Sequence, residues 1–186
     1  MYFYAHIAVI FVFVMMTGFA FGDESHPRVI VLTFDDGPRE EVLTGHKGLL
    51  ALLQKENVHG TFFVQGWRAR KNPGLVREMV QEGHSIANHT YGHATPLEWA
   101  KIHARKKGKP WKALNKGEQD AYLQKGKEVF LNDVERGRLA IESITGHSPI
   151  FMRPPKWDID QDLYCKLSGR YVVQMIPGMV RALHHD

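Results

Sequence analysis

The stretch VIVLTFDDGP, residues 29–38, is the strongest indication of the fold in this sequence. Its first six residues are a short apolar run rich in β-branched side chains, which is typical of a buried strand in a parallel sheet. Two adjacent carboxylates follow, and Gly37-Pro38 then turns the chain. Because successive side chains at a strand end point in opposite directions, Asp35 and Asp36 can face different reactants. A turn in which an aspartate caps the next helix would also account for the pair.

The composition is that of a folded protein with one core. The chain has 186 residues, a formal net charge of +4 and 44% hydrophobic residues, which favours one domain and excludes a disordered chain. The one cysteine, Cys165, excludes an intrachain disulfide, and we expect it to be buried on a helix. Lys and Arg concentrate between residues 101 and 127, which indicates a solvated face or, alternatively, contact with an anionic polymer or phospholipid headgroups. The sequence contains no nucleic-acid-binding motif, so we expect no nucleic-acid partner.

The N-terminal region contains an uncharged apolar segment, residues 7–21, followed by a polar segment. About 15 apolar residues are fewer than the roughly 20 that a bilayer span needs, and the small residues Ala20 and Gly22 suit a cleavage site. We therefore predict an export signal over residues 1–22, although no Lys or Arg precedes the apolar run. An uncleaved N-terminal anchor is the second interpretation, and a buried strand or helix is the third. Export implies a secreted protein, or one in the periplasm or cell envelope.

After residue 28, strand-like and helix-like patterns alternate. The predicted strands are residues 29–34, 60–64, 85–88, 149–152 and 171–176, and the predicted helices are residues 40–57, 73–82, 117–145 and 160–167. This alternation predicts an α/β fold with a parallel sheet and right-handed crossovers. In the long helix, we expect a buried side formed by Val129, Val134, Leu139, Ile141 and Ile144.

Polar residues follow three of the predicted strands, at the carboxyl ends where such sheets collect functional groups. The two aspartates follow the first strand, His89 and His93 follow the third, and Arg153 follows the fourth. The spacing of the two histidines allows both imidazoles to bind one ion, from a helical turn or from a loop. That spacing is weak evidence alone, because the chain has 11 histidines. With one aspartate, however, the two histidines form the three-ligand set of a catalytic zinc-type site.

Three motifs together resemble those of the NodB-type polysaccharide deacetylases, carbohydrate esterase family four. They are TFDDGP at residues 33–38, HTYGH at residues 89–93 and RPP at residues 153–155, with lesser matches at residues 60–64, 83–89 and 144–146. The resemblance implies a distorted (β/α) barrel, in a domain that we place at residues 28–186. Five predicted strands are too few to close that barrel, so we expect the domain to be truncated at its C-terminus or to adopt an open form of the fold. Residues 95–124 are an insertion relative to the family.

The resemblance implies removal of N-acetyl groups from polysaccharide that contains N-acetylglucosamine, such as peptidoglycan or a chitin-like polymer. Asp36, His89 and His93 would hold a divalent metal ion, with zinc expected first and cobalt second. Asp35 would act as the general base on the attacking water, and Arg153 would pair with Asp35 and keep it oriented. The expected partner is therefore a glycan polymer, together with cell-wall or membrane-surface contact, and we expect a monomer.

The late part of the sequence fits the family less well. The family's general acid is a histidine in a Leu-x-His motif, and Leu183-His184-His185 satisfies that pattern. We assign the role of general acid to His185, with His184 as the alternative. The other interpretation is that the two histidines are incidental and have no catalytic role. The backbone N–H of Lys156, where relatives usually carry an aromatic residue, would help to stabilise the oxyanion. Two competing hypotheses are a catalytically impaired glycan-binding protein that retains the metal, and a hydrolase of small amides or cyclic ureides.

Overall fold

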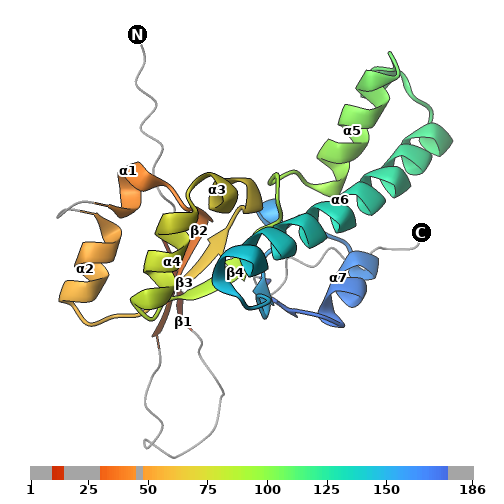
Figure 1. The fold of residues 1–186 in the computed structure, drawn as a ribbon. Coiled ribbons are helices and arrows are strands. Elements are labelled where there is room, and N and C mark those ends of the chain that lie inside the picture. The colour runs from red at the N-terminus through yellow and green to blue at the C-terminus, as the bar shows by residue number, and fades with distance from the viewer. Residues whose placement is uncertain (1–9, 15–29, 45–47, 176–186) are drawn as a thin grey trace, which may run out of the picture.

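The computed structural model describes residues 10–14, 30–44 and 48–175, which form one sheet covered by helices (Figure 1). The six strands lie side by side in chain order: β1 (Ile10–Val14), β2 (Ile30–Gly37), β3 (Thr61–Val64), β4 (Ser85–Asn88), β5 (Phe151–Met152) and β6 (Val172–Val173). Strands β2 to β6 are parallel, and β1 is antiparallel to β2. The predicted parallel α/β sheet is therefore confirmed. Within the described residues the sheet is open rather than closed into a barrel.

Strand β1 comes from the N-terminal apolar segment, for which a strand or helix of the fold was the third interpretation. It pairs with β2 from Ile10 opposite Phe34 to Val14 opposite Ile30. This pairing does not test the predicted export signal, and residues 1–9 and 15–29 lie outside the described residues. Among the helices that the structure describes, none is both long enough and apolar enough to cross a bilayer.

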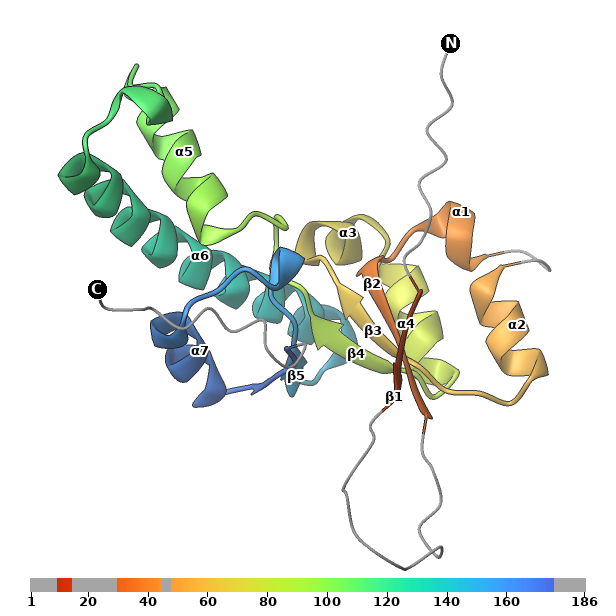
Figure 2. The same ribbon diagram turned by 180° about the vertical axis from the view of Figure 1, so that it is seen from behind.

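Seven helices and two short 3₁₀ turns connect the strands in the described chain. They are α1 (Glu40–Leu43), α2 (Leu49–Lys55), α3 (Gly66–Lys71), α4 (Pro73–Gln81), α5 (Pro96–Lys106), η1 (Trp111–Ala113), α6 (Lys116–Thr145), η2 (Pro155–Trp157) and α7 (Gln161–Ser168). Helices α3, α4 and α6 lie in front of the strands in Figure 1, and the strands lie in front in the reverse view of Figure 2. Helices α3, α4 and α6 therefore cover the same face of the sheet.

Four details differ from the sequence predictions. The predicted helix over residues 40–57 is two helices, α1 and α2; α2 begins after Gly48, where a Cβ would lie 2.4 Å from the carbonyl oxygen of Thr44. Helices α3 and α5 were not predicted, because they lie in segments without a clear apolar period. Leu139 was expected to be buried but is 50% exposed. Cys165 was also expected to be buried, but it lies exposed on α7.

The error at Leu139 has a physical cause in the buried stripe of α6. Small and polar residues occupy much of that stripe, including Gly126, Asp133 and Gly137, alongside the buried Phe130. A glycine contributes no apolar side chain to a hydrophobic pattern, but it lets a neighbouring backbone approach closely. Part of the stripe is therefore set by close packing that a search for apolar periodicity does not detect.

Helix α5 and the N-terminal half of α6 form a helical hairpin that projects away from the sheet (Figures 1 and 2). We call residues 96–128 the arm. Both helices begin with a capping box, formed by Thr95 with Glu98 and by Asn115 with Glu118. The helices pack tightly at Gly126, where a Cβ would lie only 2.2 Å from the carbonyl oxygen of Pro96. The insertion expected at residues 95–124 is thus a folded element rather than a loop.

The second buried glycine of α6, Gly137, packs against the segment that leads into the histidines. A Cβ on Gly137 would lie 2.5 Å from Oδ1 of Asn88 and 2.8 Å from the carbonyl carbon of Thr90. Asn88 is fully buried there, with its Nδ2 donating to the carbonyl oxygen of Val134 at 2.9 Å and its Oδ1 accepting the Thr90 N–H at 3.0 Å. Close approach at Gly137 therefore fixes the chain on both sides of His89.

We predict that Gly137→Ala destabilises the protein by about 1–3 kcal/mol, because the added methyl group overpacks a buried backbone contact. Gly74 on α4 is the matched control, since a Cβ added there would meet no other atom within 4 Å. Because Gly74 is the second residue of α4, Gly74→Ala should leave stability unchanged or raise it by at most about 1 kcal/mol. Urea unfolding of the two variants measures the difference, and equal midpoints would contradict the packing role of Gly137.

Candidate metal centre

The end of β2 sends its two aspartates in different directions. The pairing of β2 with β3 loses its register between Phe34 and Gly37, and Asp36 has a left-handed backbone with φ of +66°. Asp35 contacts Arg153, whereas Asp36 faces His89 and His93. The structure thus separates the two carboxylates as the alternation of side chains at a strand end predicts.

The two histidines lie in a loop, not on a helical turn. His89 directly follows β4, is 2% exposed, and donates its backbone N–H to the carbonyl oxygen of Val64 at 3.0 Å. His93 has φ of +60° and donates its backbone N–H to Oγ1 of Thr90 at 3.0 Å. Between them, the Gly92 N–H donates to the buried Asp133 of α6 at 2.8 Å. These bonds hold the imidazoles with their ring centroids 4.8 Å apart.

Asp36, His89 and His93 converge as the sequence predicted. Nε2 of His93 lies 3.0 Å from Oδ1 of Asp36, and Nε2 of His89 lies 3.7 Å from the same oxygen. One ligand atom from each residue can be chosen so that all three lie within 4.8 Å of one another. Among residues 10–14, 30–44 and 48–175, this is the one such group of three His, Cys, Asp or Glu side chains.

The hydrogen bond at the far side of the His89 ring fixes its tautomer. Nδ1 of His89 lies 2.7 Å from the carbonyl oxygen of Arg153. Because a carbonyl oxygen can only accept, Nδ1 carries the hydrogen and Nε2 keeps its lone pair towards Asp36. Burial lowers the pKa of His89, which favours the neutral ring. A metal-binding histidine commonly donates its other N–H to a carbonyl group in this way.

Arg153 places Asp35 beside the three-residue group. Its Nη1 donates to Oδ1 of Asp35 at 2.6 Å and to Oγ1 of Thr33 at 3.2 Å, and its Nη2 donates to Oε1 of Gln174 at 2.7 Å. The guanidinium also stacks over two aromatic rings, with its carbon 4.0 Å from the centroid of Phe63 and 4.7 Å from that of Trp157. Arg153 is 3% exposed, and its burial lowers its pKa while Asp35 opposes that shift. The predicted pairing of Asp35 with Arg153 is present.

Gln65 is a site residue that the sequence analysis missed. Its Nε2 donates to Oδ1 of Asp36 at 2.7 Å, while its Oε1 accepts from Nε1 of Trp67 at 2.7 Å and from Nε of Arg68 at 3.2 Å. Gln65 directly follows β3, and the carboxyl end of β3 lies between those of β2 and β4. Its position after a buried strand was the signal that could have identified it.

We predict that Gln65→Leu weakens metal binding by about 10- to 100-fold, the usual cost of losing a partner that orients a metal ligand. The leucine would keep most of the side-chain volume but remove the hydrogen bond that orients Asp36. Competition with a chromophoric chelator measures the affinity of the purified protein for zinc. Gln81→Leu, at an exposed position on α4, is the control. Equal zinc affinities for the two variants would exclude this role of Gln65.

Left-handed backbone also concentrates at the site. Of the six non-glycine residues with positive φ in the described chain, five lie at the end of β2 or in the segments that follow β4 and β5: Asp36, Thr90, His93, Lys156 and Trp157. Such conformations cost on the order of 1–3 kcal/mol each and collect where function requires them. The side chain of Lys156 forms an ion pair with Glu98 on α5, which joins the loop after β5 to the arm.

Two predicted residues are not placed, because His184 and the proposed general acid His185 lie outside the described residues. The remaining ones gather at the carboxyl edge of β2, β4 and β5, in the order that the motifs predicted. Residues 22–172 match the family described as polysaccharide deacetylase. The chain belongs to this family. The resemblance to the NodB-type deacetylases is therefore confirmed.

This chain is similar in sequence and in structure to several named carbohydrate deacetylases and esterases. A peptidoglycan-N-acetylglucosamine deacetylase of Bacillus cereus is 30% identical over 141 residues, which are 76% of this chain and 41% of that protein. The peptidoglycan deacetylase PdaC of Bacillus subtilis is 25% identical, with a TM-score of 0.55 over 77% of this chain and 55% of that one. A family 4 acetyl xylan esterase of Clostridium thermocellum, in complex with a cobalt ion, is 25% identical, with a TM-score of 0.50 over 76% and 54% of the two chains. The chain thus spans about two fifths to a little over half of the length of these proteins.

Proposed function

We propose that this polysaccharide deacetylase chain carries the metal site and base of an enzyme that removes N-acetyl groups from glycans containing N-acetylglucosamine. The observation that supports the proposal most is the convergence of Asp36, His89 and His93 beside Asp35, which is paired with Arg153. The name of the Bacillus cereus relative points to peptidoglycan as the substrate class. A chitin-like polymer contains the same N-acetylated sugar and remains within the proposal.

The donor set fits a divalent ion such as zinc or cobalt. Two imidazole nitrogens and one carboxylate oxygen are the protein ligands of many catalytic zinc sites. His89 already carries the N–H to carbonyl hydrogen bond that such ligands use, and the acetyl xylan esterase binds cobalt. When bound, the ion would supply Lewis-acid chemistry, polarising a carbonyl oxygen and acidifying water. We propose zinc as the first choice.

The residues of the chain would carry out the proton transfers. Asp35, held by Arg153 through Oδ1 and with 16% of its side chain exposed, would accept a proton from the water that attacks the acetamide carbonyl. A carbon–oxygen bond would form and the carbon–nitrogen bond would break. His185 would protonate the leaving nitrogen, so that acetate and a free amine result. The backbone N–H of Lys156 would donate to the oxyanion.

The cellular setting belongs to the same proposal. We propose export, to the outside of the cell or to the cell envelope, on the basis of the apolar residues 7–21. The glycan polymer would be the partner, with the protein acting as a monomer in contact with the cell wall or the membrane surface. These properties agree with a substrate that lies outside the cytoplasm.

Acetate release tests the proposed activity. The full chain, stripped of metal with a chelator and then reloaded with zinc or cobalt, is incubated with chitooligosaccharides and with peptidoglycan fragments. We expect acetate from the reloaded sample and none from the stripped one. A folded, metal-loaded sample that binds the glycan but releases no acetate would favour the impaired glycan-binding protein instead.

A further inference from the structure

The arm carries the positive charge of the molecule. Residues 96–128 contain nine Lys and Arg and four Asp and Glu, a net charge of +5, whereas the whole chain has +4. The rest of the chain is therefore close to neutral. A charge concentrated on one projecting element creates a local potential that attracts anions.

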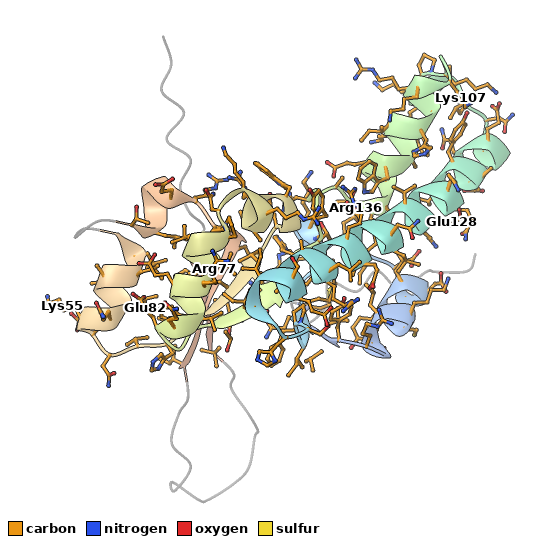
Figure 3. All side chains as sticks on the ribbon, in the orientation of Figure 1. Lys55, Arg77, Glu82, Lys107, Glu128 and Arg136 are labelled. Carbon is orange, nitrogen blue, oxygen red and sulfur yellow. The ribbon has the colours of Figure 1, made fainter. Side chains whose placement is uncertain are left out.

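The acidic residues of the arm already have partners. Glu118 pairs with Lys109 at 2.9 Å, Asp120 pairs with Lys116 at 2.9 Å, and Glu128 pairs with Lys125 at 2.8 Å. Glu98 pairs with Lys156 outside the arm. In the part of the chain that the structure describes, five cations of the arm have no acidic side chain within 4.0 Å: Lys101, Arg105, Lys106, Lys107 and Lys112. Figure 3 places Lys107 at the far end of the arm.

Helix stability explains only some of these cations. Arg105 and Lys106 lie in the last turn of α5, where the helix dipole favours positive charge. Lys109 and Lys112 lie beyond that helix, in the connection to α6, where this explanation fails. Lys101 and Arg105 are four residues apart on α5, a like-charge spacing that destabilises a helix. The charge pattern is thus not one that the fold itself requires.

A hollow between α5 and α6 lies within this basic region. Its volume is about 580 Å³, and it is lined by His103, Lys107, Lys109, Ala121, Tyr122 and Lys125. The aliphatic stems of the lysines can form its walls while their ammonium groups stay at the rim. The lining combines the aromatic Tyr122 with three lysines, of which Lys107 has no acidic side chain of the described residues within 4.0 Å. This combination suits a ring-shaped ligand that carries a negative charge, such as an acidic sugar.

The arm is also a preformed binding surface that is connected to the candidate metal centre. Two capping boxes and the close packing at Gly126 make it a preformed element, which lowers the cost of ordering a binding surface. Its first helix begins three residues after His93, and the pair formed by Glu98 and Lys156 links it to the loop that follows β5. A polymer bound along the arm would therefore lead towards the metal centre.

We propose that the arm is a second glycan-binding site, which binds a polysaccharide segment through sugars that carry carboxylate or phosphate groups. One such sugar occupies the hollow over Tyr122, and the unpaired lysines contact its neighbours along the polymer. A membrane surface is the weaker alternative, because surface insertion requires exposed large apolar side chains. Among the described residues of the arm, Ile102 is the one such side chain, with 36% exposure. This site goes beyond the proposed deacetylation and does not depend on it.

Binding of defined probes to the full chain tests this site without any measurement of catalysis. The probes are oligogalacturonate for carboxylates, a phosphorylated oligomannose for phosphates, and neutral chitohexaose for comparison. We expect one or both anionic glycans to bind more tightly than chitohexaose at low salt and to weaken as salt is added, because the Debye length shortens. Equal binding of all three, or no binding of the anionic glycans, would overturn the proposal.

Charge reversal locates the site. Lys107→Glu/Lys112→Glu should weaken the binding of the anionic glycan by about fivefold or more, because the change removes two attractive charges and adds two repulsive ones. Lys55→Glu/Arg77→Glu makes the same change in net charge on α2 and α4, away from the arm (Figure 3), and should have little effect. Tyr122→Leu, which keeps the bulk but removes the aromatic ring, should weaken binding without changing net charge. Equal losses in the two double variants would mean that net charge alone drives binding, and the proposal would be wrong.

Two further probes separate the glycan from other polyanions. Vesicles that contain phosphatidylglycerol test the membrane alternative, and a DNA oligonucleotide of matched charge tests unspecific attraction. We expect Tyr122→Leu to leave the binding of both unchanged. Tighter binding of either probe than of the acidic glycans would overturn the proposal in favour of that partner.

Discussion

Replacing Asp35 by asparagine is expected to reduce acetate release by about 10²–10⁴-fold, the usual contribution of a positioned general base. The amide has nearly the size of the carboxylate and its oxygen can still accept from Nη1 of Arg153, but it cannot take a proton from water. Asp35 is not one of the three grouped residues, and its Oδ1 accepts from Nη1 of Arg153 at 2.6 Å. The affinity for zinc should therefore stay close to that of the parent chain.

Stability provides a second measurement on the same variant. Arg153 is 3% exposed, and Asp35 is the acidic side chain with which it pairs in the described chain. Removing one partner of a buried ion pair typically costs about 3–5 kcal/mol, because a buried charge loses its compensation. Asp35→Asn should thus unfold at lower urea than the parent. Asp162→Asn, at an exposed pair on α7, is the control and should change neither property. Acetate release within about tenfold of the parent would exclude Asp35 as the base.

The sequence predicted the reactive side chains at the strand ends well. It predicted poorly the groups that form hydrogen bonds to those side chains. Asp36, His89 and His93 were identifiable because reactive side chains after buried strands of one parallel sheet must share an edge. Gln65 follows β3 in the same way, but an amide is not a typical zinc ligand, so its residue type does not mark it as part of a site. The carbonyl oxygen of Arg153, which fixes the His89 ring, is invisible in a sequence because every residue has one. Its role depends on how β4 and β5 pair.

The helices show a similar division. Helix α4 was predictable from Pro73 at its start and a glycine after its end. The buried stripe of α6 was predictable only in part: Val134 and Ile141 are buried as expected, but Gly126, Asp133 and Gly137 share the stripe and add no apolar side chain to the pattern. Helix α5 lies in a segment that the sequence analysis described only as a basic insertion. The segment has too few apolar residues to show the periodicity of a helix. Packing against α6 and the capping box of Thr95 and Glu98 stabilise it instead.

Loss of one ligand should remove the metal altogether. We expect Asp36→Ala to weaken zinc binding by more than roughly 100-fold. That value is the upper limit for losing a residue that only forms a hydrogen bond to a metal ligand. Its oxygen is the atom that faces both imidazoles, at 3.0 Å from His93 and 3.7 Å from His89. Without it, two nitrogens remain, one fewer ligand than catalytic zinc sites use. Chelator competition measures the affinity, and acetate release should disappear with the metal.

Thermal unfolding distinguishes a lost ligand from a damaged fold. Zinc at 100 times its dissociation constant should stabilise the parent chain by about 2.7 kcal/mol, which raises the melting temperature by about 5–10 °C for a chain of this size. Asp36→Ala should show no such rise, while its melting temperature without zinc stays near that of the metal-free parent, because the Asp36 side chain is 42% exposed. Gln65→Leu should show an intermediate rise, since it orients the ligand but does not replace it. A full zinc-dependent rise in Asp36→Ala would mean that the ion binds elsewhere, and the proposed metal centre would be wrong even if the enzyme were active.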